Sequence, residues 1–367
     1  ISGFDVTTTN GLITIANKKT ITATPNAEEQ YTLKLTFVNY EGDQTANASS
    51  GLSAKVMIQK EVIPQVVSDV CTNGENLATC ITTLAGKSSA SLTKIYHHDG
   101  TIKSKTEFTV ITKDDNYNDV TITHPVGTVL DAGDNSYRYA GPSGQVNNYV
   151  CFGSTTTPCP ADNLYRIIGV FGDKVKLIKS TSVGYKAWDS SRSNTWSTSS
   201  LNTYLNNEFI NTFDETTKGK ISETTWKVGG NTYDNIAYQP IKTAYQNEVV
   251  QPATDEYSTE TEYSAKIGLM YASDYGFAAA PSAWTTILNN YNGKAIKSAN
   301  WMYLGAIEWT ISRDAGDAYS AFYVYDTGSV YSSGANNALA VRPVFYLSSS
   351  VNYVSGSGTA ADPILVN

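Results

Sequence analysis

Four cysteines are the residues of this chain whose types and spacing most directly suggest chemistry. They form two close pairs, Cys71 with Cys80 in CTNGENLATC and Cys151 with Cys159 in CFGSTTTPC. Neither pair has the Cys-x-x-Cys or Cys/His spacing that is typical of zinc sites. Even pairing in a polar, Thr-rich chain favours disulfides, which persist in oxidising compartments. We therefore predict two disulfides in an extracellular or cell-surface protein, with free thiols or a metal as the alternatives.

Histidines, the usual general bases, are scarce. The three in the chain are His97, His98 and His124, so a Ser-His-acid triad has little support. Adjacent side chains of a strand point to opposite faces, so His97 and His98 cannot readily bind one ion. We expect the YHHDG segment to be an exposed polar turn. The sequence predicts no metal site and no cofactor.

Glu308 is the best single acid for an enzyme. Glycosidases use two carboxylates at a set separation, and no partner for Glu308 is identifiable from the sequence. We expect a structural ion pair with Arg342 instead, and Trp309 beside it as a structural residue. The prediction is that the protein is not an enzyme. An enzyme would instead need a deep pocket that joins Glu308 to a second acid.

Composition limits the partners. Charged residues make up 16% of the 367-residue chain and the net charge is −8, so we expect no nucleic-acid partner. Gly, Ser, Thr, Asn and 25 Tyr favour strands, turns and polar loops. No stretch approaches the roughly 20 apolar residues of a membrane span. Because the chain begins with ISGFDVTTTN, we expect a mature or truncated ectodomain, with a membrane or cell-wall anchor on a removed segment as an open alternative.

The chain divides into three expected regions, and the fold class is mainly β with an α+β C-terminal domain. Residues 1–63 read as short strands, with period-two alternation in YTLKLTFVNY, and predict an immunoglobulin-like β-sandwich. Residues 64–128 are expected to form a connector with a short helix at NLATCITTLAG and strands at TEFTVIT and DVTITH. Residues 129–367 form the C-terminal domain.

Two elements of that domain are clear from periodicity. LYRIIGVFGDKVKLIKS predicts a β-hairpin with its turn at FGDK. In STSSLNTYLNNEFINTF the apolar residues recur at the three- and four-residue spacing of a helix, and Ser199 or Ser200 is the expected N-cap. The apolar helical face is Leu201, Tyr204, Leu205, Phe209 and Phe213.

Several segments of the C-terminal region resemble a known family. They are NSYRYAG, NNYVCFG, NLYRIIGVF, VKLIKS, AWDSS, KIGLMYASDYGFAA, NWMYLGAIEWT and AVRPVFYL. From about Asp131 to Asn367 the chain is similar to exported surface proteins of gut-type Firmicutes. The resemblance implies a C-type lectin fold in its bacterial, formylglycine-enzyme-like form. YTLKLTFVNYEGDQTANASSGLSAKVMIQ likewise resembles β-sandwich modules that accompany this domain.

The same fold hosts the variable proteins of diversity-generating retroelements. Adenine-directed mutagenesis of Asn-type codons cannot produce Lys, Glu, Gln, Met or Trp, and none of these follows Trp309. A diversified C-terminal region is therefore one open possibility. The triplets of calcium-dependent sugar-binding lectins are absent, so Trp188, Asp189 and Asp274 are expected in packing and turn positions. The reactive cysteines of a formylglycine-type oxidase are also missing.

The resemblance makes VRPVFYL the last core strand of a lectin-like sheet. Val341, Phe345 and Leu347 would form its apolar face, and Pro343 would mark an edge or a bulge because it lacks an N–H. Arg342 is expected to pair with Glu308 or Asp362.

The polar stretch 313–340 would then be a displayed surface, in which Tyr supplies rigid contact area and Asn and Asp supply hydrogen bonds. The predicted ligand-binding residues are Tyr319, Tyr323, Tyr325, Asp326, Tyr331, Asn336 and Asn337. The alternative is that these are ordinary hairpin and loop residues.

The function predicted from these features is a secreted or surface-displayed, adhesin-like binding protein. Its partner would be a protein or glycan on a host, phage or bacterial surface. The alternative is a structural subunit of an extracellular fibre or pilus-like assembly. In that case the sandwich would accept a strand from a neighbour. ISGFDVTTTNGLITIA would be either the donor strand or the first strand of its own domain.

Overall fold

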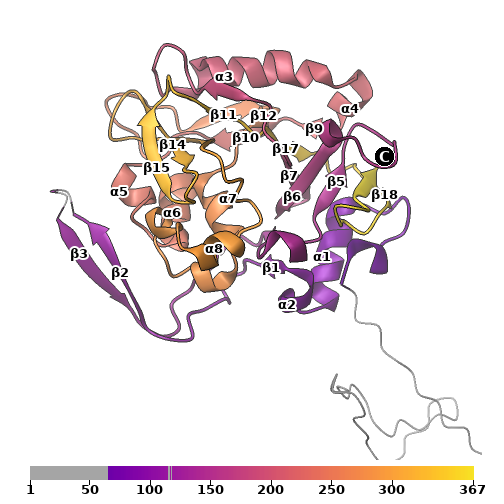
Figure 1. Cartoon of the computed structure of the whole chain (residues 1–367), viewed down its shortest axis with the longest axis horizontal. Helices are drawn as coiled ribbons and strands as arrows, with labels where there is room; N and C mark the ends of the chain where they lie inside the picture. Colours follow the sequence, from indigo (N-terminus) through magenta and orange to yellow (C-terminus); the bar gives the residue numbers. More distant parts are fainter. Residues whose placement is uncertain (1–64, 115, 117) are drawn as a thin grey trace, which may run out of the picture. The chain divides into compact units, whose positions relative to one another are not determined.

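Residues 65–367, apart from positions 115 and 117, are described by a computed structural model (Figure 1). They belong to one compact unit. The fold is mainly β with curled sheets, as predicted. The predicted immunoglobulin-like module, residues 1–63, lies outside the described residues. No helix in the described ranges is long and apolar enough to cross a membrane.

The predicted hairpin forms the centre of the larger sheet. It consists of β6, Leu164–Phe171, and β7, Lys174–Lys179. Gly172 allows the tight turn because its φ is +61°. Nearly every side chain of both strands is buried, as expected where the two faces of a sheet are both covered.

Strands on both sides extend this hairpin into a ten-stranded sheet. The main path runs in the order β12-β17-β7-β6-β5-β19-β18, while β4 pairs with β6 and β1, and β9 pairs with β17. The remaining bounds are β1 Ile95–His97, β4 Tyr137–Tyr139, β5 Tyr149–Cys151, β9 Ile221–Ser222, β12 Ile267–Gly268, β17 Val344–Leu347, β18 Tyr353–Ser355 and β19 Ile364–Val366.

The RPVFYL segment is an interior strand of this sheet. β17 lies between β7 and β12, and Phe345 and Leu347 are fully buried. Pro343 comes just before the strand, where its missing N–H costs no ladder hydrogen bond, and its carbonyl accepts from the Lys179 N–H. The prediction of a last strand was wrong. The chain continues through β18 and β19, and β19 returns to pair in parallel with β5.

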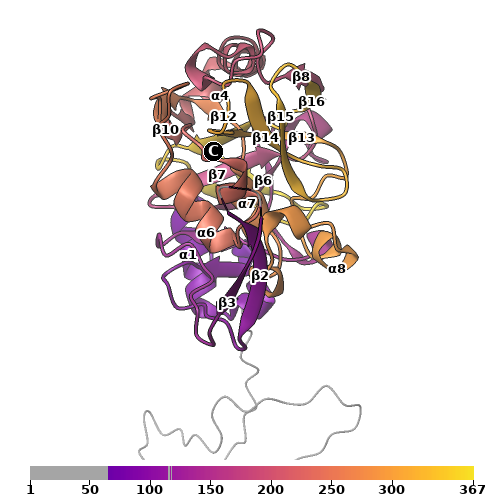
Figure 2. The same ribbon diagram turned by 90° about the vertical axis from the view of Figure 1, so that its left-hand side faces the viewer.

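A second sheet has five strands in the order β15-β14-β13-β16-β8. Figure 2 shows these strands together above the β2–β3 hairpin. Their bounds are β8 Tyr185–Ala187, β13 Glu308–Arg313, β14 Ser320–Val324, β15 Val330–Gly334 and β16 Ala338–Ala340. Two further two-stranded antiparallel sheets are the hairpin of β2 Phe108–Lys113 with β3 Asp119–His124, and the pair of β10 Thr224–Lys227 with β11 Glu262–Ala265, whose strands are separated by α5, α6 and η8.

Short helices cover the sheets. The α-helices are α1 Leu77–Lys87, α2 Ala90–Thr93, α3 Ser200–Thr203, α4 Glu215–Gly219, α5 Tyr233–Ile236, α6 Ile241–Tyr245, α7 Ala272–Phe277 and α8 Lys294–Ser298. Single 3-10 turns are η2 Val67–Asp69, η3 Ser143–Gln145, η4 Ala161–Asn163, η5 Trp196–Thr198, η9 Pro281–Ala283 and η10 Leu288–Asn290. Helix α6 continues as the π-helical turn η8, Gln246–Val250.

The predicted amphipathic helix is present from Ser200 onward. It begins with α3 and continues without a break through the π-helical η6, Tyr204–Glu208, and the 3-10 turn η7, Phe209–Thr212. Ser199 is the N-cap, and its side chain accepts from the Asn202 N–H. The predicted apolar face packs inward, since Leu201, Leu205 and Phe209 are buried.

The expected connector, residues 64–128, packs against the domain that follows it. Its predicted helix is α1, which buries Leu77, Ile81 and Leu84 in the common core. Its predicted strands are β2 and β3, whose hairpin projects from the body of the domain (Figure 1).

His98 corrects one expectation for this segment. It is fully buried, not part of an exposed turn. Its Nδ1 accepts from the Ala132 N–H, and its ring packs edge-on against Phe277 at 4.8 Å between ring centres. The pairing of β1 with β4 carries the chain inward at this point. Burial lowers the pKa of His98 well below its usual value.

Both predicted disulfides are present, Cys71–Cys80 and Cys151–Cys159. The first joins the segment after η2 to helix α1, and the second joins the end of β5 to the following loop. They point to an oxidising, non-cytoplasmic environment.

Replacing Cys151 and Cys159 together with alanine is expected to lower the free energy of unfolding by about 2–3 kcal/mol, because a short closed loop restricts the unfolded chain. Urea denaturation checks this, with the midpoint falling. The wild type measured after reduction should show a decrease at least as large, since both disulfides are then open. An unchanged midpoint in the double variant would contradict the expectation.

Candidate functional site

The turn end of the β14–β15 hairpin brings three of the predicted ligand-binding residues together. Tyr323 lies directly opposite Tyr331 in the antiparallel register. Tyr325 follows on the same face, because side chains alternate along a strand. Ring centres are 6.2 Å apart for Tyr323–Tyr331, 6.2 Å for Tyr323–Tyr325 and 5.8 Å for Tyr325–Tyr331. We call these three residues, together with Asp326, the tyrosine face.

The tyrosine face is held by its turn. The Tyr325 N–H donates to the Ser329 carbonyl, and the Gly328 N–H donates to the Tyr325 carbonyl. Gly328 has a φ of +98°, a conformation that favours glycine. The three tyrosines are each half-buried and Asp326 is exposed. Each ring therefore has a packed side that fixes it and an open side available for contact.

Tyr319, Asn336 and Asn337 lie at the other end of the same hairpin. The Ala335 N–H donates to the Tyr319 carbonyl, which brings the start of β14 close to the residues after β15. Tyr319 is 44% exposed and both asparagines are exposed. The Arg192 guanidinium lies 4.5 Å from the centre of the Tyr319 ring. The seven predicted residues thus form two groups, one at each end of the hairpin.

Sequence reasoning missed neighbours that come from distant segments. Tyr233 in α5 stacks on Tyr331 with ring centres 6.5 Å apart, and it also contacts Tyr238. The Tyr303 hydroxyl donates to the Asp326 carbonyl. Burial raises the pKa of Tyr233 and of Tyr323. Tyr-rich composition was the available signal, but it does not show which tyrosines meet.

Two of the residues predicted to be structural, Glu308 and Trp309, lie on β13 of this sheet, and Arg342 follows β16. Trp309 on β13 is fully buried, donates through Nε1 to the Lys186 carbonyl and packs edge-on against Tyr323. Arg342 donates to both carboxylate oxygens of Glu308, at 2.6 and 2.8 Å, and to the Met302 carbonyl at 2.7 Å. The ion pair expected from the sequence is therefore present. Asp362, the other candidate, instead accepts from the Ser357 N–H.

Trp188 and Asp189 are packing and turn residues, as expected. Trp188 is fully buried and its Nε1 donates to the Thr310 carbonyl. The Asp189 carboxylate accepts from the backbone N–H groups of Ser193 and Ser200. These hydrogen bonds hold the loop that leads from β8 into helix α3.

A second cluster, which the sequence reading did not single out, is buried between β4, β7 and α7. Lys176 Nζ lies 2.5 Å from Asp274 Oδ2, and Arg138 lies 3.5 Å from Asp274 Oδ1. Arg138 also pairs with the partly exposed Asp134 at 2.6 Å. Asp274 is buried, as expected of a packing position, but it lies in helix α7 and not in a turn, and its Oδ2 accepts from the Tyr271 N–H at the start of that helix. A cavity of about 190 Å³ borders Lys176, Arg138 and Asp274.

Aromatic rings surround the amine of this buried cluster. Ring centres of Tyr271, Tyr346, Phe171 and Trp226 lie 4.4, 5.3, 5.4 and 5.5 Å from Lys176 Nζ. Burial lowers the pKa of Lys176, and Asp274 acts against this change. The available signal was a lysine within a strand whose other residues read as fully buried.

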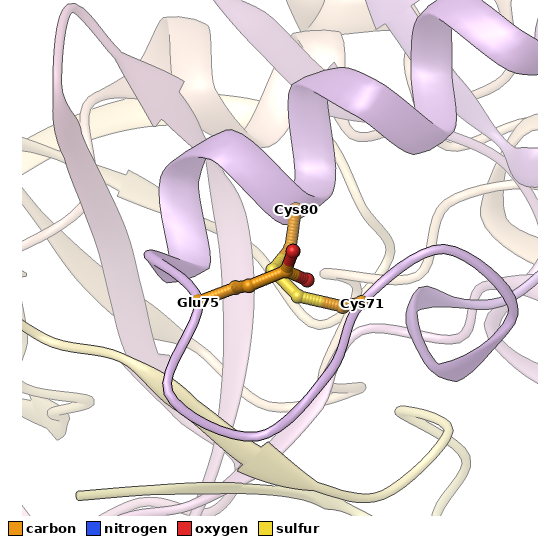
Figure 3. A group of neighbouring side chains, drawn as sticks. All are labelled: Cys71, Glu75 and Cys80. Carbon is orange, nitrogen blue, oxygen red and sulfur yellow. A yellow bond between two sulfur atoms is a disulfide. The ribbon is translucent and has the colours of Figure 1, made fainter.

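The metal alternative for the first cysteine pair can be judged from its geometry. Within the described ranges, Cys71, Glu75 and Cys80 form the one group of three metal-ligating side chains with their ligand atoms within 4.8 Å. The two sulfurs are bonded to each other (Figure 3), so they are not thiolate ligands. Glu75 instead accepts from the Thr72 N–H in the loop that the disulfide closes.

Comparison with known proteins gives one family match. Residues 172–349 match the model of a domain of unknown function (DUF6273). The matched segment runs from the β6–β7 turn to just past β17, and so contains Lys176, Asp274 and the whole five-stranded sheet with its tyrosine face. No curated protein and no solved structure matches the chain.

Proposed function

We propose that this chain is a secreted or cell-surface-displayed binding protein whose tyrosine face contacts a protein or glycan ligand. The observation that carries the proposal is the side-by-side packing of Tyr323, Tyr325 and Tyr331 next to the exposed Asp326. Tyrosine rings that are already held in place offer contact area at small entropic cost, and their hydroxyls can form hydrogen bonds. The buried Trp309 packs edge-on against Tyr323, and the Glu308–Arg342 pair holds the adjoining residue of β13.

The second group, Tyr319 with Asn336 and Asn337, extends the proposed contact surface along the hairpin. Its amides and the Arg192 guanidinium supply hydrogen-bond donors, which suit carbonyl and hydroxyl groups of a peptide or sugar. The proposed recognition is therefore non-covalent and needs no metal. That the protein is not an enzyme stays a prediction.

We also propose that this domain is C-type-lectin-like. The mainly β fold and the sequence resemblance over Asp131 to Asn367 support this assignment. An N-terminal immunoglobulin-like spacer and diversification of the C-terminal region belong to the same proposal. A near-copy of the DNA that encodes residues 313–340, next to a reverse transcriptase gene, would support diversification. The fibre-subunit alternative depends on residues 1–63, which lie outside the described residues.

A binding screen tests the function. The wild type is applied to immobilised glycans and to bacterial and host cells, and a variant with Tyr323, Tyr325 and Tyr331 all changed to serine is applied in parallel. We expect binding to fall to background. Because these rings also pack against one another and Trp309, we expect the variant to lose stability, by about 0.5–1.5 kcal/mol per lost aromatic pair. Circular dichroism at the screening temperature checks that it remains folded.

Two control variants separate contact from packing. Tyr323, Tyr325 and Tyr331 changed to phenylalanine keep the rings and remove the hydroxyls, so the fold should be unaffected and binding reduced. Tyr185→Ser removes a tyrosine that is 69% exposed on β8, at the opposite edge of the same sheet, and should bind as the wild type. Full binding by the serine variant, or no binding by the wild type to any probe, would refute the proposal.

A further inference from the structure

The amine of Lys176 and the carboxyl group of Asp274 are in direct contact in a buried site. Lys176 lies on β7 and Asp274 lies in the first turn of α7, 98 positions later. Both side chains are 1% exposed, and Nζ is 2.5 Å from Oδ2. Four aromatic rings lie within 5.5 Å of Nζ and cover much of the amine.

The two groups are also oriented. The Tyr271 N–H donates to Asp274 Oδ2 at 3.0 Å, which holds the carboxyl group across the start of α7. The second oxygen, Oδ1, faces the Arg138 guanidinium at 3.5 Å. One oxygen therefore faces the amine, while the other faces a fixed positive charge. This arrangement favours attack of Lys176 Nζ on Asp274 Cγ, the carbon that carries the two oxygens.

We propose that Lys176 and Asp274 become joined by an intramolecular amide bond, which links strand β7 covalently to helix α7. The proposal is independent of the tyrosine face. It assigns Lys176 as the nucleophile, Asp274 as the acyl group and Arg138 as the group that stabilises charge on Oδ1.

The reaction balances without an external reagent. A proton passes from the Lys176 ammonium to Asp274 Oδ2 through their hydrogen bond, which leaves a neutral amine and a carboxylic acid. Nζ then forms a bond to Cγ and places negative charge on Oδ1, close to Arg138. The Cγ–Oδ2 bond breaks, and Oδ2 leaves as water with the second amine proton. The adjoining cavity of about 190 Å³ can receive that water.

The electrostatics of the site support the first step. Burial disfavours the charged ammonium and lowers the pKa of Lys176, so the neutral amine is more accessible than it is in water. A desolvated lysine of this kind is a recognised way to make an amine nucleophilic. The product replaces two buried charges with one neutral amide, which removes their desolvation cost.

Intact-mass spectrometry of the purified chain tests the proposal. After reduction and alkylation of the four cysteines, the wild type should be lighter by one water molecule than the mass calculated for its alkylated sequence. Lys176→Arg, which keeps a cation against Asp274 but lacks the nucleophilic amine, should have the full mass of its sequence. The wild-type measurement alone decides the matter if a variant fails to fold.

Tryptic digestion locates the bond. Trypsin should fail to cleave after Lys176 in the wild type, and one branched peptide should contain both Lys176 and Asp274. A wild-type chain at its full sequence mass would overturn the proposal. Loss of water that persists in Lys176→Arg would do the same, because the dehydration would then lie elsewhere in the chain.

Discussion

Arg342→Met is expected to lower the free energy of unfolding by about 3–5 kcal/mol, the cost of leaving one member of a buried ion pair without its partner. The Glu308 and Arg342 side chains are 2% and 3% exposed. Removing the guanidinium strands the Glu308 carboxylate and also leaves the Met302 carbonyl without its donor. Urea denaturation at neutral pH measures this change. The urea concentration at the midpoint should fall while the dependence of the free energy of unfolding on urea concentration stays the same.

The deficit of Arg342→Met should depend on pH with a definite sign. Burial raises the pKa of Glu308, and Arg342 acts against that rise. Without Arg342 the folded-state pKa rises further above the unfolded value, so the folded state binds the proton more tightly. Stability from this group is then present at acidic pH and is lost as pH rises from the unfolded pKa through the folded pKa. The gap between variant and wild type should therefore narrow on acidification.

A matched double variant separates charge from packing. Glu308→Gln combined with Arg342→Met removes both charges and should recover part of the stability that Arg342→Met loses. A deficit in Arg342→Met below about 1 kcal/mol, the range of an exposed pair, would contradict the buried arrangement. The arrangement would also be contradicted if the double variant lost more free energy of unfolding than the summed losses of Glu308→Gln and Arg342→Met measured separately.

Asp274→Ala is the second change with a large expected effect. It removes the carboxylate that faces both Lys176 and Arg138, so two buried cations lose their shared partner, while the partly exposed Asp134 remains paired with Arg138 and the buried Glu248 still acts on Lys176. It also removes the acceptor for the Tyr271 N–H at the start of α7. We expect the free energy of unfolding to fall by about 3–5 kcal/mol.

The pH dependence of Asp274→Ala has the opposite direction. Burial lowers the pKa of Lys176, and loss of the opposing carboxylate lowers it further. The unfolded state then binds more protons than the folded state, so stability rises with pH between the folded and unfolded pKa values. The deficit of this variant should shrink as the solution becomes alkaline, which urea denaturation across an alkaline series measures.

Three comparisons control this experiment. Lys176→Arg cannot form the proposed amide but keeps the ion pair, so it is the reference for the charge effect alone. Asp274→Asn keeps the acceptor for Tyr271, and its deficit relative to Asp274→Ala isolates the cap. Asp162→Ala removes a carboxylate that is 99% exposed and lies 3.7 Å from Lys179, and should change little. Equal effects of Asp274→Ala and Asp162→Ala would contradict the burial argument.

Much of the local structure could be predicted because it depends on spacing within a few residues. The two apolar runs LYRIIGVF and KVKLIKS on either side of the FGDK turn set a hairpin, and the helical spacing of Leu201, Leu205 and Phe209 sets a helix. The cysteine pairs are near enough in the chain to close short loops. The position of VRPVFYL could not be predicted in this way. Its apolar side chains indicate burial, whereas its place between β7 and β12 depends on partners far away in the chain.

The two candidate sites also differ in how far apart their residues lie in the sequence. The β14–β15 hairpin is local, so the meeting of Tyr323, Tyr325 and Tyr331 could be predicted from a turn at Asp326. Tyr233 joins them from α5, about ninety positions earlier in the chain, and no periodicity relates the two segments. The residues of the buried cluster come from three elements in the same way.

The sequence by itself determined that this protein is mainly β, that its cysteines pair as disulfides and that it has only three histidines, because composition and short-range periodicity carry that information. Tertiary structure alone decided that His98 is buried and that Lys176 meets Asp274. A strand pattern shows that a residue alternates between two faces. The packing of β4, β7 and α7 decides which of those faces is buried. The same packing decides that the buried Lys176 meets the carboxylate of Asp274.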